Sequence, residues 1–343
     1  PEHDMEHAIG TRSATRPRVG DWVVNVLVLL VTVAIAWTGA EIYVAKVIDD
    51  GMQFDLEMWR YAKYIKRQSA SPAIGHEHTP NTRAHLMGAD VAISSQGLRD
   101  REFPLAPPPG KTRIMMLGDS LAFGWGVPVE KTSSKQLEQM LINAGHDVEV
   151  INTGVGNYNT EMEVAYFLER GHKFQPHYVV LNYFINDAEP TPRDRSNFLS
   201  RHSPAYVFFA SRVDMALRMV NTGEKKDWKT YYASLYEGDE GIGRVAAAIE
   251  KLAKYCRENN IRLYIANQPE LREPKNYPFA QVDRMLEKIA DANKVPYIPL
   301  LPTVRDLEPE SLWVTRPDPH PSAVAHEAFA QGLYQFLDRE LKR

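Results

Sequence analysis

An apolar strand and a sharp turn meet in the stretch Arg113-Ile114-Met115-Met116-Leu117-Gly118-Asp119-Ser120-Leu121, which continues into the glycine-rich segment 122–126. Strands that are buried on both faces of a parallel sheet carry such nearly continuous apolar runs. Open α/β sheets place their chemistry at the carboxyl ends of their strands, and Ser120 stands at that end. Because a serine hydroxyl is a weak nucleophile until a base takes its proton, we expect a base and oxyanion donors elsewhere in the chain.

Alternating strand and helix patterns continue from this stretch to the C-terminal region. Four more apolar runs of strand length follow the first, at 148–152, 178–184, 261–266 and 296–300. Helical patterns separate or follow these runs near 129–144, 160–172, 242–259, 279–292 and 322–341. Five short apolar strands separated by helices predict an α/β domain over 111–343, with a mostly parallel sheet that is covered on both faces.

Residues 188–240 interrupt this alternation. They contain a predicted helix near 205–220 and an aromatic segment over 228–236. We interpret the region as an insertion that caps the site. Its aromatic side chains are expected either to line a sugar or acyl pocket or to pack into the core.

An uncharged apolar segment of 19 residues, 22–40, lies near the N-terminus. About 20 apolar residues span a bilayer as a helix, and Trp22 and Trp37 suit its two interfaces. Three arginines precede the segment, which predicts a cytoplasmic tail over 1–20, a transmembrane helix over 21–41 in a bacterial inner membrane, and a periplasmic or extracellular catalytic domain. The alternatives are a cleaved signal peptide and a buried helix of a soluble protein.

Residues 42–110 join this segment to the α/β domain. A helical pattern over 41–69 predicts a juxtamembrane helix. Six prolines between positions 72 and 109 then predict an extended lead-in.

Composition excludes several functions. The chain has 343 residues and a formal charge of −4, which argues against a nucleic-acid partner. Its single cysteine, Cys256, cannot form an internal disulfide, and the sequence contains neither a CxxC nor an HExxH motif. We therefore expect no metal, no cofactor and no nucleic acid.

Polar groups that can stabilise an oxyanion follow the second and third strands. Gly156 and Asn157 lie in the turn after the second strand, where both residue types tolerate unusual backbone angles and let a main-chain N–H point inward. Asn186 follows the third strand and offers a side-chain amide. Together with the N–H of Ser120 these groups form the predicted oxyanion hole, with Gly156 and Asn157 as alternatives.

The segment Arg316-Pro317-Asp318-Pro319-His320-Pro321-Ser322 precedes the last helix. Each proline restricts the residue before it to extended geometry. Side chains at i and i+2 of an extended stretch fall on the same face, with Cα atoms about 6–7 Å apart. Asp318 can therefore reach one imidazole nitrogen of His320 and leave the other for Ser120, as a Ser-His-Asp triad requires. Asp306 is the alternative acid.

These segments, in this order, resemble the SGNH (GDSL) hydrolase superfamily over about residues 113–340. Gly118-Asp119-Ser120-Leu121 matches the nucleophile block, and Asn186-Asp187 matches the end of the third block. Asp318 and His320 match the acid–histidine block. The resemblance implies a flavodoxin-like three-layer α/β/α sandwich and metal-free cleavage or transfer of acyl esters.

Three departures from the family pattern are visible. Phe184 stands where the third block usually has glycine, and Asn157 falls in the usual glycine position of the second block, beside Gly156. One residue separates Asp318 from His320, where most members have two. The shorter spacing resembles that of bacterial polysaccharide O-acetylation proteins of the alginate type.

The triad pattern and the export segment together predict a membrane-anchored serine esterase or O-acyltransferase. Its expected substrate is an acylated glycan or a similar ester, and a membrane acyltransferase is a candidate partner. The alternatives are a lipase or thioesterase of the same fold and a non-catalytic partner of a polysaccharide acylation machine. The presence of both Ser120 and His320 favours a catalytic protein.

Overall fold

The computed structural model describes residues 19–192, 196–222, 227–316 and 318–342. The predicted cytoplasmic tail, apart from its last two residues, lies outside the described residues, and so does Pro317. The chain divides into two compact units, Pro1–Ile48 and Asp49–Arg343.

The described part of the first unit is helical. Helix α1 (Val19–Tyr43) is followed by the short π-helix η1 (Val44–Ile48). The segment Trp22–Ile48 has the length and the mean hydropathy, 2.2, of a membrane-spanning helix, and apart from the buried Val44 its apolar side chains are at least partly exposed. Such a helix fits a membrane anchor or a signal sequence.

Five parallel strands form the central sheet of the second unit, in the order β6-β5-β7-β8-β9. Their bounds are β5 (Thr112–Leu117), β6 (Val148–Asn152), β7 (Tyr178–Tyr183), β8 (Arg262–Asn267) and β9 (Tyr297–Pro299). All five predicted strands are confirmed, with each end within one residue of its expected position. Their carboxyl ends share one edge, which brings the polar segments that follow β5, β6 and β7 together.

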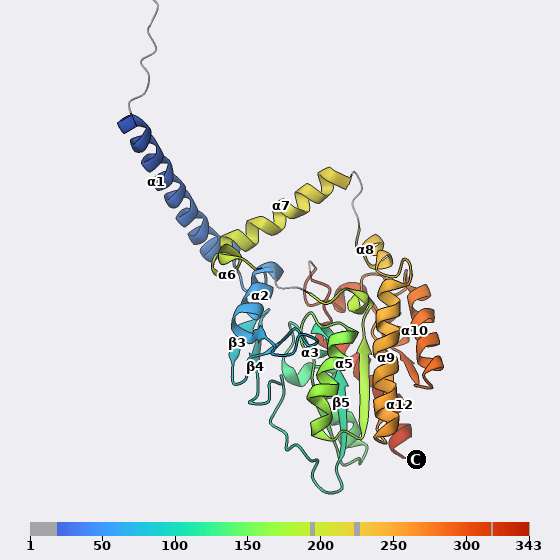
Figure 1. Ribbon diagram of the computed structural model, residues 1–343. Coiled ribbons are helices and arrows are strands. Elements are labelled where there is room, and N and C mark those ends of the chain that lie inside the picture. Colours follow the sequence, from blue (N-terminus) through green and yellow to red (C-terminus); the bar gives the residue numbers. More distant parts are fainter. Residues whose placement is uncertain (1–18, 193–195, 223–226, 317, 343) are drawn as a thin grey trace, which may run out of the picture. The chain divides into compact units, whose positions relative to one another are not determined.

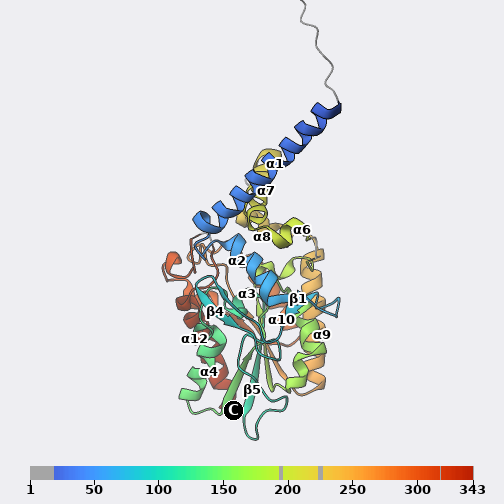
Figure 2. The same cartoon turned by 90° about the vertical axis from the view of Figure 1, so that its left-hand side faces the viewer.

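Helices cover both faces of this sheet, which gives three layers. Side chains of α4 and α12 form one core with Met116 of β5, and side chains of α5, α9 and α10 form the other with Met115. Figure 2 shows α4 and α12 on one side of β5 and α9 on the other. The helices are α4 (Ser133–Asn143), α5 (Thr160–Glu169), α9 (Glu240–Glu258), α10 (Ala280–Ala292) and α12 (Ala323–Leu341). The predicted three-layer fold is confirmed.

Residues 49–110, called the lead-in from here on, are helical over much of the range 49–69, where a helix was expected, but they also form four short strands that were not expected. They form α2 (Phe54–Arg60), the π-helix η2 (Tyr61–Ile65), β1 (Lys66–Gln68), β2 (His76–His78), β3 (Arg83–Leu86) and β4 (Ala89–Ala92). The strands pair as two antiparallel hairpins, β1-β2 and β3-β4. These strands have only three or four residues each, and β1 and β2 consist of polar residues alone, so the sequence shows no strand pattern there. A third apolar cluster packs Tyr61 and Ile65 against Phe123 and Trp125.

The insertion after β7 is helical (Figure 1). It follows η5 (Ile185–Ala188) and contains α6 (Phe198–His202), α7 (Pro204–Thr222) and α8 (Trp228–Ser234). Trp228 and Tyr232 of α8 pack on Phe279, with ring centroids 5.7 and 6.0 Å away. The remaining short helices are α3 (Ser120–Phe123), η3 (Val129–Lys131), η4 (Gly171–Phe174), α11 (Leu301–Val304) and η6 (Pro309–Ser311).

Candidate active site

Ser120 is the first residue of α3, directly after the turn that ends β5. The Asp119 carboxylate caps this helix by accepting from the Leu121 N–H at 2.8 Å. A Cβ on Gly118 would lie 2.5 Å from the Ala122 side chain, so the turn requires glycine. The N–H of a first helical residue has no acceptor within its helix, which leaves the Ser120 N–H available to a substrate oxygen.

The segment before α12 brings an imidazole onto this serine. His320 Nε2 lies 2.9 Å from Ser120 Oγ. His320 Nδ1 is hydrogen-bonded to Asp318 Oδ1, which also accepts from the His320 backbone N–H at 3.2 Å. Asp318 is 1% exposed, whereas Asp306, the alternative acid, lies on the surface. The three side chains therefore form one continuous hydrogen-bonded path.

Two aromatic side chains hold this acid and imidazole in place. Trp125 Nε1 donates to the second carboxylate oxygen, Asp318 Oδ2, at 2.9 Å, so both buried oxygens have partners. Phe54 stacks on the His320 ring with centroids 5.9 Å apart and 29° between the planes. No motif in the sequence marks either Trp125 or Phe54 as part of the site.

Asn186 lies beside the nucleophile. Its Nδ2 is 3.4 Å from Asp119 Oδ2, and the same oxygen is 3.4 Å from Ser120 Oγ. Its Oδ1 is buried and has no partner among the described residues. Because the bond that holds the amide is long, its N–H groups remain available to an oxyanion.

The two alternative oxyanion donors in the turn after β6, the N–H groups of Gly156 and Asn157, differ in their hydrogen bonding. The Gly156 N–H already donates to the Tyr61 hydroxyl at 2.9 Å, and a Cβ on Gly156 would lie 2.7 Å from the Tyr61 ring. Asn157 has a φ of +66°, a left-handed conformation that asparagine tolerates. Within the described part of the chain, the Asn157 N–H has no hydrogen-bond acceptor. Of the two candidates, Asn157 is therefore the one whose N–H is available.

A buried acidic group lies behind the nucleophile turn. Glu163, Asp187 and Asp119 are each at most 2% exposed. Both Glu163 carboxyl oxygens lack hydrogen-bond partners among the described residues. Burial, and then the charges of Asp187 and Asp119, raise the pKa of Glu163 well above its ordinary value. Burial and the Asp119 charge raise the pKa of Asp187 in the same way.

Glu163→Gln is expected to make stability less sensitive to pH. A carboxyl whose pKa is raised in the folded state stabilises that state below its unfolded pKa, about 4.3, and loses this contribution as pH rises toward the folded pKa. We expect the melting temperature of the wild type to fall between pH 5 and pH 8, and Glu163→Gln to remove about 2–6 °C of that fall. The neighbouring Glu161, whose partly exposed side chain lies 3.4 Å from Arg244, supplies the control, Glu161→Gln. An identical fall in wild type and Glu163→Gln would contradict the raised pKa.

A cleft of about 250 Å³ opens over the nucleophile. It is lined by Phe54, Ser120, Leu121, Phe184, Asn186, Tyr232, Pro269, Glu270, Leu271, Arg272, Asp318, Pro319, His320 and Pro321. The cleft thus contains the serine, the imidazole and the Asn186 amide, with walls from the lead-in (Phe54) and the insertion (Tyr232). Among the described residues, no group of three or more His, Cys, Asp or Glu side chains is arranged to hold a metal ion.

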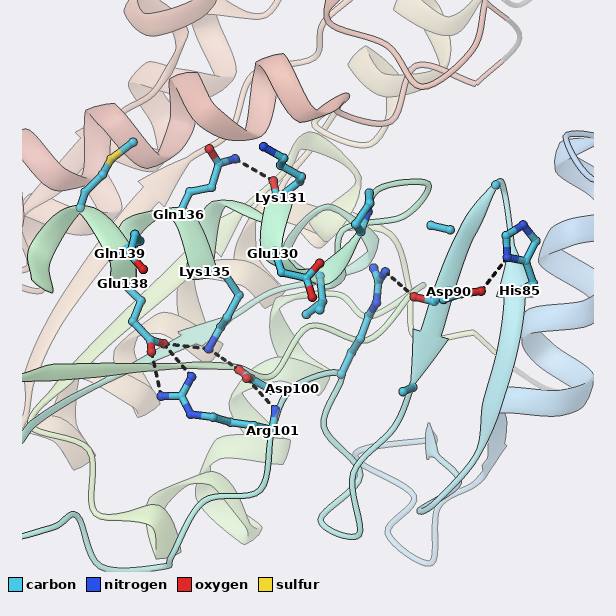
Figure 3. Close-up of a pocket in the computed structure, with 17 residues that line it drawn as sticks. His85, Asp90, Asp100, Arg101, Glu130, Lys131, Lys135, Gln136, Glu138 and Gln139 are labelled. Atoms are coloured by element: carbon cyan, nitrogen blue, oxygen red, sulfur yellow. Dashed lines mark hydrogen bonds and ion pairs between the residues drawn. The ribbon is translucent and has the colours of Figure 1, made fainter. Parts of the chain in front are cut away.

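A larger cavity of about 1070 Å³ lies between β3-β4 and α4 (Figure 3). Its charged side chains largely satisfy one another. Lys135 contacts Asp100 at 2.7 Å and Glu138 at 2.9 Å, and Arg101 contacts Glu138 at 2.8 Å. The cavity contains neither Ser120 nor its partners. We therefore assign it a structural role and place the chemistry in the smaller cleft.

The model of the GDSL-like lipase/acylhydrolase family matches residues 116–328. The chain belongs to this family. The assignment confirms the predicted resemblance at the family level, and the matched region begins after the lead-in. No curated protein sequence matches this GDSL family member.

Solved structures similar to this GDSL family member include several hydrolases. TesA is 13% identical, with 66% of this chain and 99% of TesA covered and a TM-score of 0.46. A lipase/acylhydrolase from Enterococcus faecalis is 14% identical, with 67% and 96% covered and a TM-score of 0.45. The acetyl xylan esterase AlAXEase is 15% identical, with 66% and 99% covered and a TM-score of 0.43.

Proposed function

We propose that this GDSL family member is a membrane-anchored serine esterase or O-acyltransferase that acts on an acylated glycan or a similar ester outside the cytoplasm. The proposal rests on the hydrogen-bonded path from Ser120 through His320 to Asp318 at the cleft. Family membership supports ester chemistry, and α1 supports the anchor.

In the proposed reaction, His320 Nε2 takes the proton of Ser120 as Oγ attacks the ester carbonyl carbon. Asp318 keeps the proton of His320 on Nδ1 and stabilises the imidazolium. The oxyanion accepts from the N–H groups of Ser120 and Asn157 and from Asn186 Nδ2. The ester C–O bond then breaks, and His320 protonates the leaving alcohol. Water, or an acceptor hydroxyl in transfer, attacks the acyl-enzyme and regenerates Ser120.

The walls of the cleft favour a short acyl group on a hydroxylated alcohol. The volume, about 250 Å³, is below the roughly 300–1,000 Å³ of pockets that hold drug-sized ligands. Glu270 and Arg272 form an ion pair in the wall at 2.5 Å. Phe184 and Tyr232 present aromatic surface next to it, with ring centroids 6.1 Å apart. Aromatic surface beside charged hydrogen-bonding groups suits a sugar ring, which has both apolar faces and hydroxyl edges.

Substrate preference tests this proposal. The full chain in detergent is assayed on an acetylated xylo-oligosaccharide, on p-nitrophenyl acetate and on p-nitrophenyl palmitate, and is treated with a serine-directed fluorophosphonate. We expect turnover of both acetyl esters and labelling of Ser120. Preference for palmitate would favour the lipase or thioesterase alternative. Absence of turnover and of labelling would favour a non-catalytic partner. Added unacylated oligosaccharide that becomes acetylated would identify transfer.

The proposed location is tested separately. A reporter enzyme that is active only outside the cytoplasm is fused to the C-terminus of the chain. We expect reporter activity, together with retention of the chain in the membrane fraction. Release of a shortened soluble protein would identify α1 as a cleaved signal, and an inactive reporter would contradict the proposed topology.

A further inference from the structure

The peptide that joins Gly156 to Asn157 is held by side chains of the lead-in. Its carbonyl, Gly156 O, accepts from Lys66 Nζ at 3.2 Å and from His76 Nε2 at 2.9 Å. A trans peptide points its C=O and its N–H in opposite directions, so two donors on the carbonyl also determine where the Asn157 N–H points. Donors on a carbonyl polarise the peptide and strengthen its N–H as a donor.

The N–H of Gly156, one peptide earlier, is held by a second set of hydrogen bonds. Gly156 N–H donates to the Tyr61 hydroxyl, which lies 2.7 Å from His78 Nε2, and His78 Nδ1 lies 3.1 Å from Gly97 O. Burial lowers the pKa of His78 to about 3, so its ring is neutral. A neutral ring accepts at one nitrogen and donates at the other, so Tyr61 donates to Nε2 and Nδ1–H donates to Gly97 O.

Lys66 also contacts Asn157, the residue that stands where the family pattern usually has glycine. Its Nζ donates to Asn157 Oδ1 at 3.0 Å and lies 4.9 Å from the centroid of the Tyr61 ring. Left-handed backbone conformations of residues other than glycine persist when their surroundings hold them. The lysine therefore holds both the side chain of Asn157 and the peptide before it.

We propose that Lys66, His76 and Tyr61 are positioning residues that aim the Asn157 N–H at the oxyanion. This inference rests on the proposed function and deepens it, because it assigns part of the transition-state binding to the lead-in. None of the three side chains lies within residues 116–328, the region that the family model matches.

The charge of Lys66 predicts a pH dependence of kcat, which a purely structural role of this residue would not produce. Burial lowers the pKa of Lys66 to about 7. Burial and the Lys66 charge lower the pKa of His76 to about 4. Burial also lowers the pKa of His78, which keeps its ring neutral, and raises the pKa of Tyr61. Of these four groups, Lys66 alone changes charge between pH 6 and pH 8. A neutral amine is a weaker donor than an ammonium, so kcat is expected to fall as pH rises through about 7.

Lys66→Met tests the inference, with Arg67→Met as the matched control on the same strand. The Arg67 side chain pairs with Glu77 instead, at 2.7 Å. On p-nitrophenyl acetate we expect Lys66→Met to lower kcat about 10- to 100-fold, below the 10²–10³ that loss of an oxyanion donor itself costs, with KM changed less than about twofold. Phenylboronic acid, which forms a tetrahedral adduct with the serine, should bind Lys66→Met more weakly by a similar factor. Arg67→Met should match the wild type in both measurements.

Lys66→Arg separates charge from structure. Arginine stays charged at all accessible pH values, so this variant should recover part of the turnover and lose the decline of kcat near pH 7. Equal kcat and equal boronate binding in wild type and Lys66→Met would overturn the inference and leave the proposed function intact. A wild type without esterase turnover would instead overturn the proposed function. If Lys66→Met does not fold, a pH decline that persists unchanged in Lys66→Arg overturns the inference.

Discussion

Ser120→Ala is expected to abolish ester turnover while the fold stays intact. The serine supplies the only oxygen that His320 Nε2 contacts in the described residues, at 2.9 Å, and alanine offers no nucleophile. Loss of the nucleophile of a triad typically lowers kcat by about 10⁴ or more. The measurement is turnover of a small acetyl ester by the full chain, together with a thermal melt.

Ser311→Ala is the control for this substitution. Ser311 is exposed, and its hydroxyl donates only to the nearby Glu308 carbonyl, at 2.7 Å. We expect this variant to keep wild-type turnover. A Ser120→Ala protein that melts normally and retains turnover within about tenfold of the wild type would exclude Ser120 as the nucleophile.

Asp318→Asn is expected to lower kcat by roughly 10²–10⁴ with little change in KM. The reason lies in two side chains that the carboxylate contacts, Trp125 and His320. Trp125 Nε1 can only donate, so the oxygen of an introduced amide will turn toward Trp125, and its NH₂ will face His320 Nδ1. His320 must then accept at Nδ1 and carry its proton on Nε2, where it cannot take the proton of Ser120.

Asp306→Asn is the matched control, because Asp306 precedes the same loop but lies on the surface. We expect its turnover and melting temperature to equal those of the wild type. A larger loss of turnover in Asp306→Asn than in Asp318→Asn, at unchanged melting temperature, would show that the acid of the triad is not Asp318.

The sheet was predictable from the sequence because its strands are buried on both faces. The run 113–117 is apolar at four of its five positions and 148–152 at three of five, and the turns that follow them carry small or polar residues. The lead-in was not predictable in the same way. Its four strands pair locally in two hairpins and have only three or four residues each, and the two strands of the first hairpin consist of polar residues, so the runs are too short for an alternating pattern to stand out.

Some residues of the candidate site could likewise be predicted from the sequence, and others could not. Ser120, Asp318 and His320 stand in local patterns whose geometry follows from prolines and from the position at the strand end. Trp125 and Phe54 contact the acid and the imidazole across large separations in sequence, and only the folded chain brings them there. The choice between Gly156 and Asn157 also depended on a distant residue, Tyr61, whose hydroxyl occupies the Gly156 N–H.

The lead-in packs against the nucleophile turn. The part of this protein that folds as one unit is therefore longer than residues 116–328, the segment that the family model matches. A fragment trimmed to residues 111–343 would uncover Phe123 and Trp125, which Tyr61 and Ile65 now cover. It would also remove the stacking partner of His320. Such a fragment would retain every family motif, yet it would expose an aggregation-prone apolar patch. For expression and engineering, the shortest sound catalytic fragment therefore begins near Asp49, at the edge of the compact unit.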